Sequence, residues 1–224
     1  MFSYNMSNTS EIQEIYTKKA DLYHNVFFDI LKWDKAIQLF FQKENHLRSQ
    51  LRVLDAGCGS GLITQVLFDI SKQKKLSGIT FNAFDLTKAM LNLFKKWIIK
   101  NNVKNIEIKQ ANVLELDRLP KNWKNYDLII SSAMLEYLSK KEIEIALVSL
   151  KNLLKKNGKI VVLITKRNIV TNWLVERWWK ARTYKNQEIE QIFSKTGFHN
   201  IKFKQFPKPY KYLNLGVLII EANK

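Results

Sequence analysis

The chain has 224 residues, of which 46% are hydrophobic and only 3 are proline, a composition that predicts one well-buried domain and argues against extensive disorder. Its single cysteine, Cys58, excludes an internal disulfide and a cysteine-based metal cluster, and no apolar run reaches the roughly 20 residues that cross a bilayer. The formal net charge of +17 comes mainly from lysines scattered through every segment, which favours a solvated basic surface over a dedicated nucleic-acid-binding face.

The N-terminal part of the chain is predicted to be helical. Apolar side chains recur at near-helical spacing from Ser10 to about Tyr23, and again from about Phe27 to Phe41. We expect residues 1–45 to form a helical cap or lid and residues 46–224 to form the main domain.

From Arg52 onward, predicted strands and helices alternate. Short apolar runs predict strands, and amphipathic stretches of helical period predict helices. The expected strands are Arg52–Asp55, Gly78–Asp85, Asn105–Lys109, Tyr126–Ser131, Lys159–Thr165, Ile201–Phe206 and Leu213–Ala222. The expected helices are Leu62–Lys72, Lys88–Lys100 with Thr87 as N-cap, Lys140–Lys156 ended by Asn157-Gly158, and Gln187–Thr196 ended by Gly197.

This alternation predicts an α/β fold, a three-layer sandwich in which helices cover both faces of a mostly parallel sheet. The last two strands have no helix between them, so we expect an antiparallel pair at the sheet's edge, with the last strand antiparallel. The prediction is therefore a seven-stranded sheet with an N-terminal helical cap. Such a sheet differs from the six parallel strands of a nucleotide dehydrogenase.

The most informative stretch is the loop Gly57-Cys58-Gly59-Ser60-Gly61, which holds three of the 7 glycines. Glycine lets a ligand approach the backbone, and a loop between a strand and a helix points free N–H groups at what binds there. The spacing departs from the dinucleotide fingerprint G-x-G-x-x-G, and the Lys-Ser/Thr ending of a Walker loop is absent. Asp55, before the loop, is unfavourable for a pyrophosphate but suits a cationic amino group.

At Val53 to Gly61 the sequence closely resembles the class I (Rossmann-like) S-adenosylmethionine (SAM)-dependent methyltransferases of the small-molecule type, whose first motif typically reads [VL]-L-D-x-G-C-G-x-G. The resemblance extends over roughly Ile15 to Asn223, with weaker motifs in the family's order. It implies that residues 46–224 bind SAM and release S-adenosylhomocysteine (SAH). From the first motif it implies cofactor contacts by Asp55, Gly57, Cys58, Gly59 and Gly61.

The second and third motifs imply further cofactor contacts. Phe84 to Leu91 resembles the motif whose acid binds both ribose hydroxyls, which adds Asp85, Leu86 and Met90 to the expected site. A carboxylate can accept both hydrogen bonds of a vicinal diol, although Asp85 could instead be only a helix-leading acid stabilised by the dipole. At Ala111-Asn112-Val113 the family usually has an aspartate on the adenine amine, and the amide oxygen of Asn112 can still accept there.

Tyr126 to Leu138 resembles the fourth motif. In relatives, the segment just after this strand lies beside the methionine moiety and the methyl group of SAM. Ser131 is therefore expected at the cofactor. Glu136 and Tyr137 are candidate catalytic residues, with Glu136 either a base or a ligand for a cationic substrate, or else confined to an indirect or surface role. The stretch Leu153 to Lys159 is similar to the family's L-[KR]-P-G-G turn before the fifth strand, without its proline and one glycine.

Three other residue types carry less specific signals. Relatives often have an A-x-x-Y segment that closes over the cofactor, which makes Tyr23 a cofactor candidate, with aromatic packing as the alternative. Cys58 occupies the family's loop-cysteine position, where packing is favoured over a role as nucleophile. The histidines are scattered along the chain, so no metal site is predicted.

The insertion at about 167–185 is expected to be a substrate lid, with an amphipathic helix buried in the core as the alternative. Its aromatic and basic side chains suit a flat, apolar or anionic acceptor, or an anionic membrane surface. The residues expected to act there are Trp173, Arg177, Trp178 and Arg182. Ser131-Ser132-Ala133-Met134 also departs from the [DNS]-P-P-[YFW] sequence of adenine or glutamine nitrogen methylation, which makes a small-molecule acceptor with an O, N or C nucleophile the expectation.

Two other functions stay open at this point. One is an RNA or protein methyltransferase that uses the basic surface, and the other is a non-catalytic SAM-binding protein. Nucleic acid is a less favoured partner, peripheral membrane contact is an alternative, and no oligomeric state is predicted. Because Met1 to Glu11 lack the apolar stretch of a secretory signal, we expect a cytoplasmic location.

Overall fold

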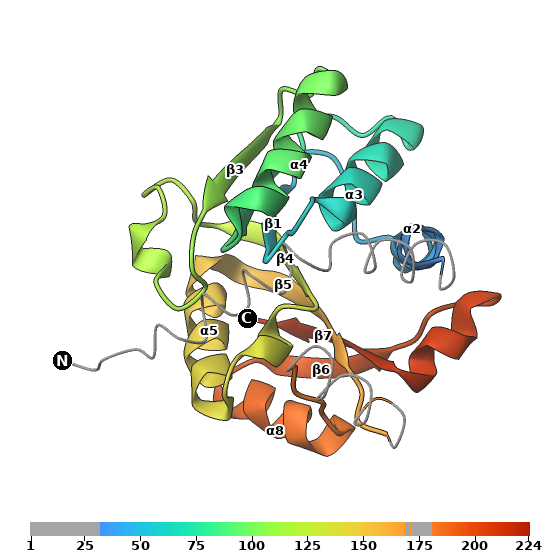
Figure 1. Cartoon of the computed structure of the whole chain (residues 1–224), viewed down its shortest axis with the longest axis vertical. Coiled ribbons are helices and arrows are strands. Elements are labelled where there is room, and N and C mark those ends of the chain that lie inside the picture. The colour runs from blue at the N-terminus through green and yellow to red at the C-terminus, as the bar shows by residue number, and fades with distance from the viewer. Residues whose placement is uncertain (1–31, 169–170, 172–180) are drawn as a thin grey trace.

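Seven strands form one sheet in the order β3-β2-β1-β4-β5-β7-β6 (Figure 1). This computed structural model describes residues 32–168, 171 and 181–224. The strands are β1 (Arg52–Ala56), β2 (Thr80–Asp85), β3 (Ile106–Gln110), β4 (Tyr126–Ser132), β5 (Leu154–Thr165), β6 (His199–Lys204) and β7 (Val217–Asn223).

The direction of the strands agrees with the sequence. β1 pairs in parallel with β2 and β4, β2 with β3, and β4 with β5. β7 pairs antiparallel with both β5 and β6, so β6 runs parallel to the first five strands. The predicted fold class, with its antiparallel last strand, is confirmed. Strand order reverses between β1 and β4, and in open α/β sheets ligands bind at the carboxyl ends of the strands beside such a point.

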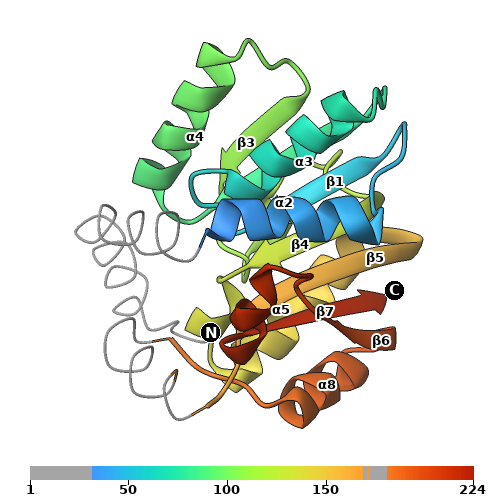
Figure 2. The same cartoon turned by 90° about the vertical axis from the view of Figure 1, so that its right-hand side faces the viewer.

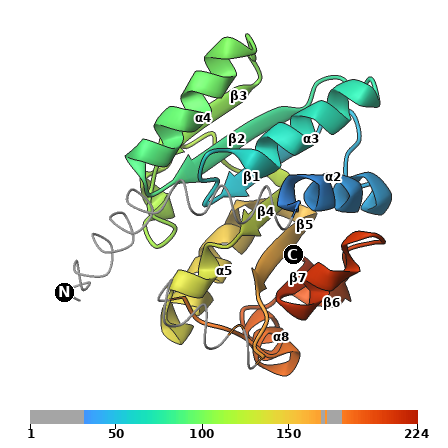
Figure 3. The same ribbon diagram turned by 45° about the vertical axis from the view of Figure 1, so that its right-hand side comes forward.

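Helices cover both faces of this sheet (Figure 3). On one face lie α2 (Trp33–Glu44), α3 (Leu62–Gln73) and α4 (Lys88–Lys100), whose apolar side chains share a core with Val53, Phe81 and Leu128. On the other face α5 (Lys140–Leu153) and α8 (Asn186–Lys195) pack against Leu54, Ile129 and Val162. The alternation of these side chains along each strand divides them between the two faces. Among the described residues, no helix is long and apolar enough to span a bilayer.

The described part of residues 1–45 is the helix α2, which lies alongside α3 (Figure 2). It begins at Trp33 and extends to Glu44, past the expected end at Phe41, while residues 27–31 and the expected helix Ser10–Tyr23 lie outside the described residues. Trp33, Ile37 and Phe40 are buried, and Trp33 makes an edge contact with Phe206 at a centroid distance of 5.4 Å. This end of the expected cap therefore shares the core of the sheet. The boundary at residue 45 stays a prediction.

The expected end of the helix before β5 is wrong. α5 ends at Leu153 and not at Lys156, and β5 begins at Leu154, so Asn157 and Gly158 do not stop a helix. Tyr126 of β4 pairs with Leu154 and Leu128 with Lys159, which leaves an irregularity in β5 between them. The expected turn of the fifth motif thus lies inside the strand. The apolar side chains keep a helical spacing beyond Leu153, but pairing with β4 places the residues from Leu154 onward in a strand.

The last two expected strands also have different bounds. β6 begins at His199, before the expected Ile201. The expected last strand starts at Leu213, but residues 213–215 instead end the 3₁₀ helix Tyr210–Leu215, and β7 begins at Val217. Asn214 stabilises this turn, because its Oδ1 accepts from the Phe206 backbone N–H at 2.8 Å.

A partly buried network of charged groups joins α2 to the antiparallel edge of the sheet. Oε2 of Glu221 in β7 lies 2.7 Å from Nε2 of His46, and Lys159 Nζ donates to Oε1 at 2.9 Å. Lys204 pairs with Glu44 beside them. The oxygens of the two glutamates and a His46 nitrogen lie close enough to ligate a cation. Because each of these carboxylates already pairs with a lysine, we interpret the group as an ion-pair network.

This network makes a prediction about stability. The hydrogen bond from His46, with help from Lys159, lowers the pKa of Glu221 from 4.5 to about 2. A carboxylate whose pKa is lower in the folded state contributes stability above its unfolded pKa and loses it as the pH falls. We expect Glu221→Gln to lower the free energy of unfolding by about 2 kcal/mol at pH 7, and the difference to shrink between pH 4.5 and 2.

Urea unfolding of the two proteins across that pH range checks the prediction, with the exposed Glu190→Gln on α8 as the matched control. An equal loss of stability in both variants, or a difference independent of pH, would contradict it.

Candidate functional site

The glycine loop after β1 is tied to the end of β2. The backbone N–H groups of Gly57 and Cys58 both donate to the Phe84 carbonyl at 2.9 Å, and the Gly59 N–H donates to Oδ2 of Asp85 at 2.8 Å. Gly61 then begins α3 as its N-cap, with φ at 85°. The loop thus joins the carboxyl ends of β1 and β2, where the strand order predicts a ligand.

Two of the loop glycines are required by their surroundings. A Cβ at Gly61 would lie 2.3 Å from the ring of Phe94 in α4, and one at Gly57 would lie 2.6 Å from Met134. Both residues also have a positive φ, which side chains other than glycine rarely adopt. At Gly59 the φ is also positive, at 54°, but a Cβ would only make an ordinary contact with the Met90 methyl at 3.5 Å.

Asp85 is held at the carboxyl end of β2 by two backbone amides. Its Oδ2 accepts from Gly59, as above, and its Oδ1 accepts from the Thr87 N–H at 2.7 Å. Burial raises the pKa of Asp85 above its usual value, and these hydrogen bonds limit the rise. Thr87 is the N-cap residue of α4, as expected, but its side chain makes no capping hydrogen bond. The carboxylate keeps lone pairs that a ligand could use.

Asp55 lies deeper, between β1 and α3. Its Oδ2 accepts from the Thr64 hydroxyl at 2.7 Å and from the Thr64 N–H at 3.2 Å. Its Oδ1 is buried and has no partner among the described residues. Burial raises the pKa of Asp55 to about 7. A buried oxygen without a donor is costly, so a cationic group would be stabilised there.

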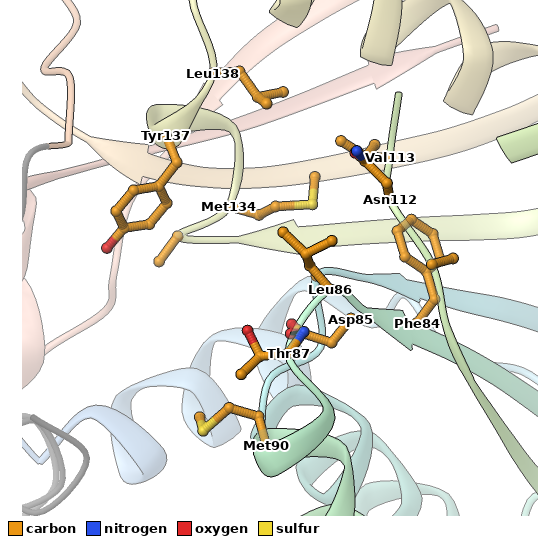
Figure 4. Close-up of a pocket in the computed structure, with 13 residues that line it drawn as sticks. Phe84, Asp85, Leu86, Thr87, Met90, Asn112, Val113, Met134, Tyr137 and Leu138 are labelled. Atoms are coloured by element: carbon orange, nitrogen blue, oxygen red, sulfur yellow. Dashed lines mark hydrogen bonds between the residues drawn. The ribbon is translucent and has the colours of Figure 1, made fainter. Parts of the chain in front are cut away.

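A pocket of about 620 Å³, counting its open mouth, lies over the ends of β1, β2 and β4 and beside the segment that follows β3 (Figure 4). Its lining is mostly apolar, with Asp85, Thr87, Asn112 and Tyr137 as polar or part-polar members. The lining residues are Gly57, Phe84, Asp85, Leu86, Thr87, Met90, Ala111, Asn112, Val113, Ala133, Met134, Tyr137 and Leu138.

The pocket brings together seven of the residues singled out from the sequence. They are Gly57, Asp85, Leu86, Met90, Asn112, Val113 and Tyr137. The lining does not include Asp55, Cys58, Gly59, Gly61, Ser131 or Glu136. Sequence reasoning missed Phe84, Thr87, Ala111, Ala133, Met134 and Leu138. All six belong to the motif stretches, so taking whole motifs as lining would have found them.

Asn112 lies in the third motif with its side chain partly engaged. Its Oδ1 accepts from the Leu114 backbone N–H at 3.0 Å, which fixes the amide at the pocket wall. The oxygen keeps a second lone pair, and the amide nitrogen adds a donor that an aspartate would not have.

Two of the expected residues have buried side chains. Cys58 is only 7% exposed and belongs to the apolar core of α2, α3 and α4. Burial raises the pKa of its thiol well above the usual value, which disfavours a nucleophilic role and agrees with packing. Ser131 is fully buried, and its hydroxyl has no partner among the described residues.

The segment after β4 forms the 3₁₀ turn η3 (Leu135–Tyr137). Tyr137 faces the pocket, whereas Glu136 is 5% exposed and accepts from the Thr165 hydroxyl at 2.8 Å. The Arg182 N–H donates to the Glu136 carbonyl at 2.8 Å, although the Arg182 side chain is exposed. Of the other expected residues, Tyr23, Trp173, Arg177 and Trp178 lie outside the described part of the chain.

Several solved structures with this fold are methyltransferases. The chain superposes on magnesium protoporphyrin IX methyltransferase of Synechocystis PCC 6803, solved with bound SAM, with a TM-score of 0.68 and 13% identity, covering 97% of each chain. It superposes on phosphoethanolamine N-methyltransferase 2 of Haemonchus contortus with a TM-score of 0.69 and 12% identity, covering 95% of this chain and 60% of that one. At these identities the likeness concerns the fold.

The family follows from the sequence. A family model described as a methyltransferase domain matches residues 47–206, and the chain belongs to this family. A curated relative, malonyl-[acyl-carrier protein] O-methyltransferase of Halalkalibacterium halodurans, is 28% identical over 152 residues, which cover 67% of this chain and 53% of that protein. The chain thus spans about half the length of that relative.

Proposed function

We propose that the protein is a SAM-dependent methyltransferase that acts on a small-molecule acceptor. The observation that carries this proposal is the Asp85 carboxylate, held by the Gly59 and Thr87 amides at the wall of the pocket. This places an acid with free lone pairs beside the glycine loop, at the end of the strand next to β1. The family, and the small-molecule methyltransferases with the same fold, support the choice of cofactor.

The residues present fit SAM. The two oxygens of Asp85 can accept from the ribose hydroxyls, and the unpartnered Oδ1 of Asp55 is a buried acceptor suited to the amino group. Leu86 and Val113 supply apolar contacts for the adenine ring, with Asn112 at its polar edge. SAM supplies a methyl group activated by a positively charged sulfur.

The chain's own contribution to such a reaction is positioning. Methyl transfer from a sulfonium is an in-line displacement, so alignment of the acceptor and exclusion of water do most of the work. Met134 and Leu138 form apolar walls after β4, and Tyr137 adds a phenol at the same wall (Figure 4).

Asp55 makes SAH binding depend on pH. Because burial raises its pKa to about 7, the free protein must release a proton below pH 7 before the carboxylate can pair with an ammonium group. Linkage at a pKa of about 7 then gives an SAH dissociation constant roughly tenfold higher at pH 6 than at pH 8.

Calorimetry at the two pH values, in buffers of different ionisation enthalpy, measures both the affinity and the proton release. Asp55→Asn should flatten the dependence, whereas the exposed Asp69→Asn on α3 should keep it. Equal affinity at both pH values without proton release would count against this role of Asp55.

The activity itself is tested with SAM carrying a deuterated methyl group. The purified chain is incubated with a bacterial extract separated into metabolites, RNA and protein, and the label is followed by mass spectrometry. We expect label in the metabolite fraction, absent from reactions with Asp85→Ala. Label in RNA or protein instead would establish the alternative that uses the basic surface, and SAH binding without any transfer would favour a non-catalytic SAM-binding protein.

Several expectations about the domains, the location and the partners of the protein stay predictions. The division into a cap, residues 1–45, and a SAM-binding domain, residues 46–224, belongs to this proposal, as does the substrate lid at about 167–185. So do the cytoplasmic location and the less favoured contacts with nucleic acid or a membrane surface. The net charge of +17 motivates those contacts, and binding to heparin or anionic vesicles with a steep salt dependence would reveal them.

A further inference from the structure

The segment that joins β6 to β7 is basic. Between His199 and Ile220 the chain has four lysines and neither aspartate nor glutamate. Lys204 pairs with Glu44, as described above. Lys208 and Lys211 are exposed, and neither forms an ion pair or a side-chain hydrogen bond with another described residue. The positive charge of these two lysines is therefore available to an anionic partner.

Two apolar side chains are exposed close to these lysines in the chain. The 3₁₀ helix η5 (Tyr210–Leu215) buries Leu213 but leaves Tyr212 44% and Leu215 73% exposed. In a 3₁₀ helix, side chains three residues apart lie one above the other, so Tyr212 and Leu215 share one side of η5. Leu215 is the most exposed large hydrophobic residue in the described part of the chain. We call Lys208, Lys211, Tyr212 and Leu215 the η5 patch.

The exposure of these residues does not come from a loosely attached loop. Phe206 and Leu213 are buried in the core that α2 shares with the sheet, where Phe206 contacts Trp33. The side chain of Asn214 accepts from the Phe206 N–H at 2.8 Å and donates to the Phe206 carbonyl at 3.3 Å. Both ends of the segment are thus fixed, and the η5 patch is held in place on the surface.

The η5 patch lies at the same edge of the sheet as the pocket. Val217, at the start of the antiparallel β7, pairs with Thr165 at the carboxyl end of β5, and η5 directly precedes β7 (Figure 2). The Asn168 amide donates to the Leu215 carbonyl at 2.6 Å, which ties η5 to the chain that leaves β5. The pocket lies over the carboxyl ends of β1, β2 and β4, which run parallel to β5.

We propose that the η5 patch docks the protein on an anionic lipid surface. Lysines near such a surface are attracted by the lipid phosphates, an exposed leucine gains by entering the boundary between headgroups and acyl chains, and tyrosine is stable at that boundary. Lysines alone would suit the phosphates of a nucleic acid equally well. A leucine that is 73% exposed beside them favours the lipid, because only the lipid offers it an apolar environment. This docking goes beyond methyl transfer and does not depend on it.

Helix α4 supplies a matched control on the same molecule. It carries lysines and no acidic residue, and its Ile99 is 68% exposed close to Lys95 and Lys96. Because α4 begins with Lys88 after the carboxyl end of β2 and leads back to the start of β3, Ile99 lies toward the opposite edge of the sheet. The two places have similar chemistry, but only the η5 patch lies at the edge that holds the pocket.

Sedimentation of the full chain with vesicles measures the docking. We expect vesicles of phosphatidylcholine with about one third phosphatidylglycerol to bind the wild type about tenfold or more tighter than pure phosphatidylcholine vesicles do. Replacing Lys208 and Lys211 together by glutamine should weaken binding about 30-fold, and Leu215→Ser about tenfold. The α4 variants, Ile99→Ser and the pair Lys95→Gln with Lys96→Gln, should stay within about threefold of the wild type.

A fluorescent label separates insertion of Leu215 from adsorption by charge. The one native cysteine, Cys58, is buried, so Leu215→Cys offers a single accessible thiol for an environment-sensitive dye. We expect the emission of this label to shift to the blue when anionic vesicles are added. The same dye on Ile99→Cys should show no shift.

Absence of wild-type binding to the anionic vesicles, or equal losses in the η5 and α4 variants, would overturn the proposal. Binding that depends on the two lysines but not on Leu215, with no shift of the label, would also overturn it. Weaker retention of the lysine variant on heparin, with vesicle binding unchanged, would assign the patch to nucleic acid instead. Titration with SAH tests the proposed function separately, since none of these substitutions touches the pocket.

Discussion

Replacing Asp85 by alanine is expected to raise the dissociation constant of SAH by about 100-fold or more. The carboxylate would lose two hydrogen bonds from the ribose hydroxyls, and hydrogen bonds to a charged group contribute about 1.5–3 kcal/mol each. The variant also frees the Gly59 and Thr87 amides, which at present donate to the two carboxylate oxygens. The loop would therefore lose its attachment to β2 as well as its ligand contact.

Calorimetric titration with SAH measures this effect, and thermal unfolding confirms that the variant is folded at the assay temperature. Asp69→Ala is the matched control, because Asp69 is an exposed acid on α3 with no part in the pocket. An Asp85→Ala protein that binds SAH within threefold of the wild type would remove the observation that carries the proposed function.

Gly61→Ala is expected to destabilise the fold by about 2–5 kcal/mol. A Cβ at this position would lie 2.3–2.5 Å from three atoms of the Phe94 ring, and Phe94 is fully buried between α4 and the sheet. Overpacking of a core costs about 1–3 kcal/mol, and the left-handed backbone, with φ at 85°, adds about 1–2 kcal/mol. For a domain of this size the melting temperature should fall by about 5–15 °C.

Differential scanning calorimetry checks the loss, with Gly216→Ala as the control. Gly216 has a negative φ, and its nearest neighbour to a new Cβ is a Thr171 methyl at 3.6 Å, an ordinary contact. The control should therefore unfold within about 2 °C of the wild type, since an alanine fits there without strain. Equal melting temperatures in the two variants would show that Phe94 yields at little cost, and that the glycine at position 61 serves the ligand alone.

The succession of the strands along the chain and their directions could be predicted because the apolar runs are short and the glycines and polar residues between them are clear. Their order within the sheet was not predicted. The end of α5 could not be predicted. Leu153 and Leu154 continue the apolar periodicity of the helix, and only the pairing of Leu154 with Tyr126, far away in the sequence, places Leu154 in a strand. Leu213 is a second case: the sequence predicts a strand there, but in the structure Leu213 is buried in a 3₁₀ helix.

The cofactor part of the site was accessible to sequence reasoning because its residues lie in consecutive motifs. Asp85, Asn112 and Tyr137 reach one pocket since the ends of neighbouring strands meet at one edge of the sheet. The partner of Glu136 was not accessible. Thr165 lies 29 positions further along the chain and carries no motif of its own. Contacts of this kind depend on how β5 and the segment after it pack.

The central claim is that the pocket beside Asp85 binds SAM, and titration of the wild-type full chain with SAH tests it most directly. At pH 8 and 0.15 M salt we predict a single site with a micromolar dissociation constant, and a melting temperature that rises with SAH concentration as binding to the folded state requires. No heat of binding and an unchanged melting temperature at millimolar SAH would contradict the account.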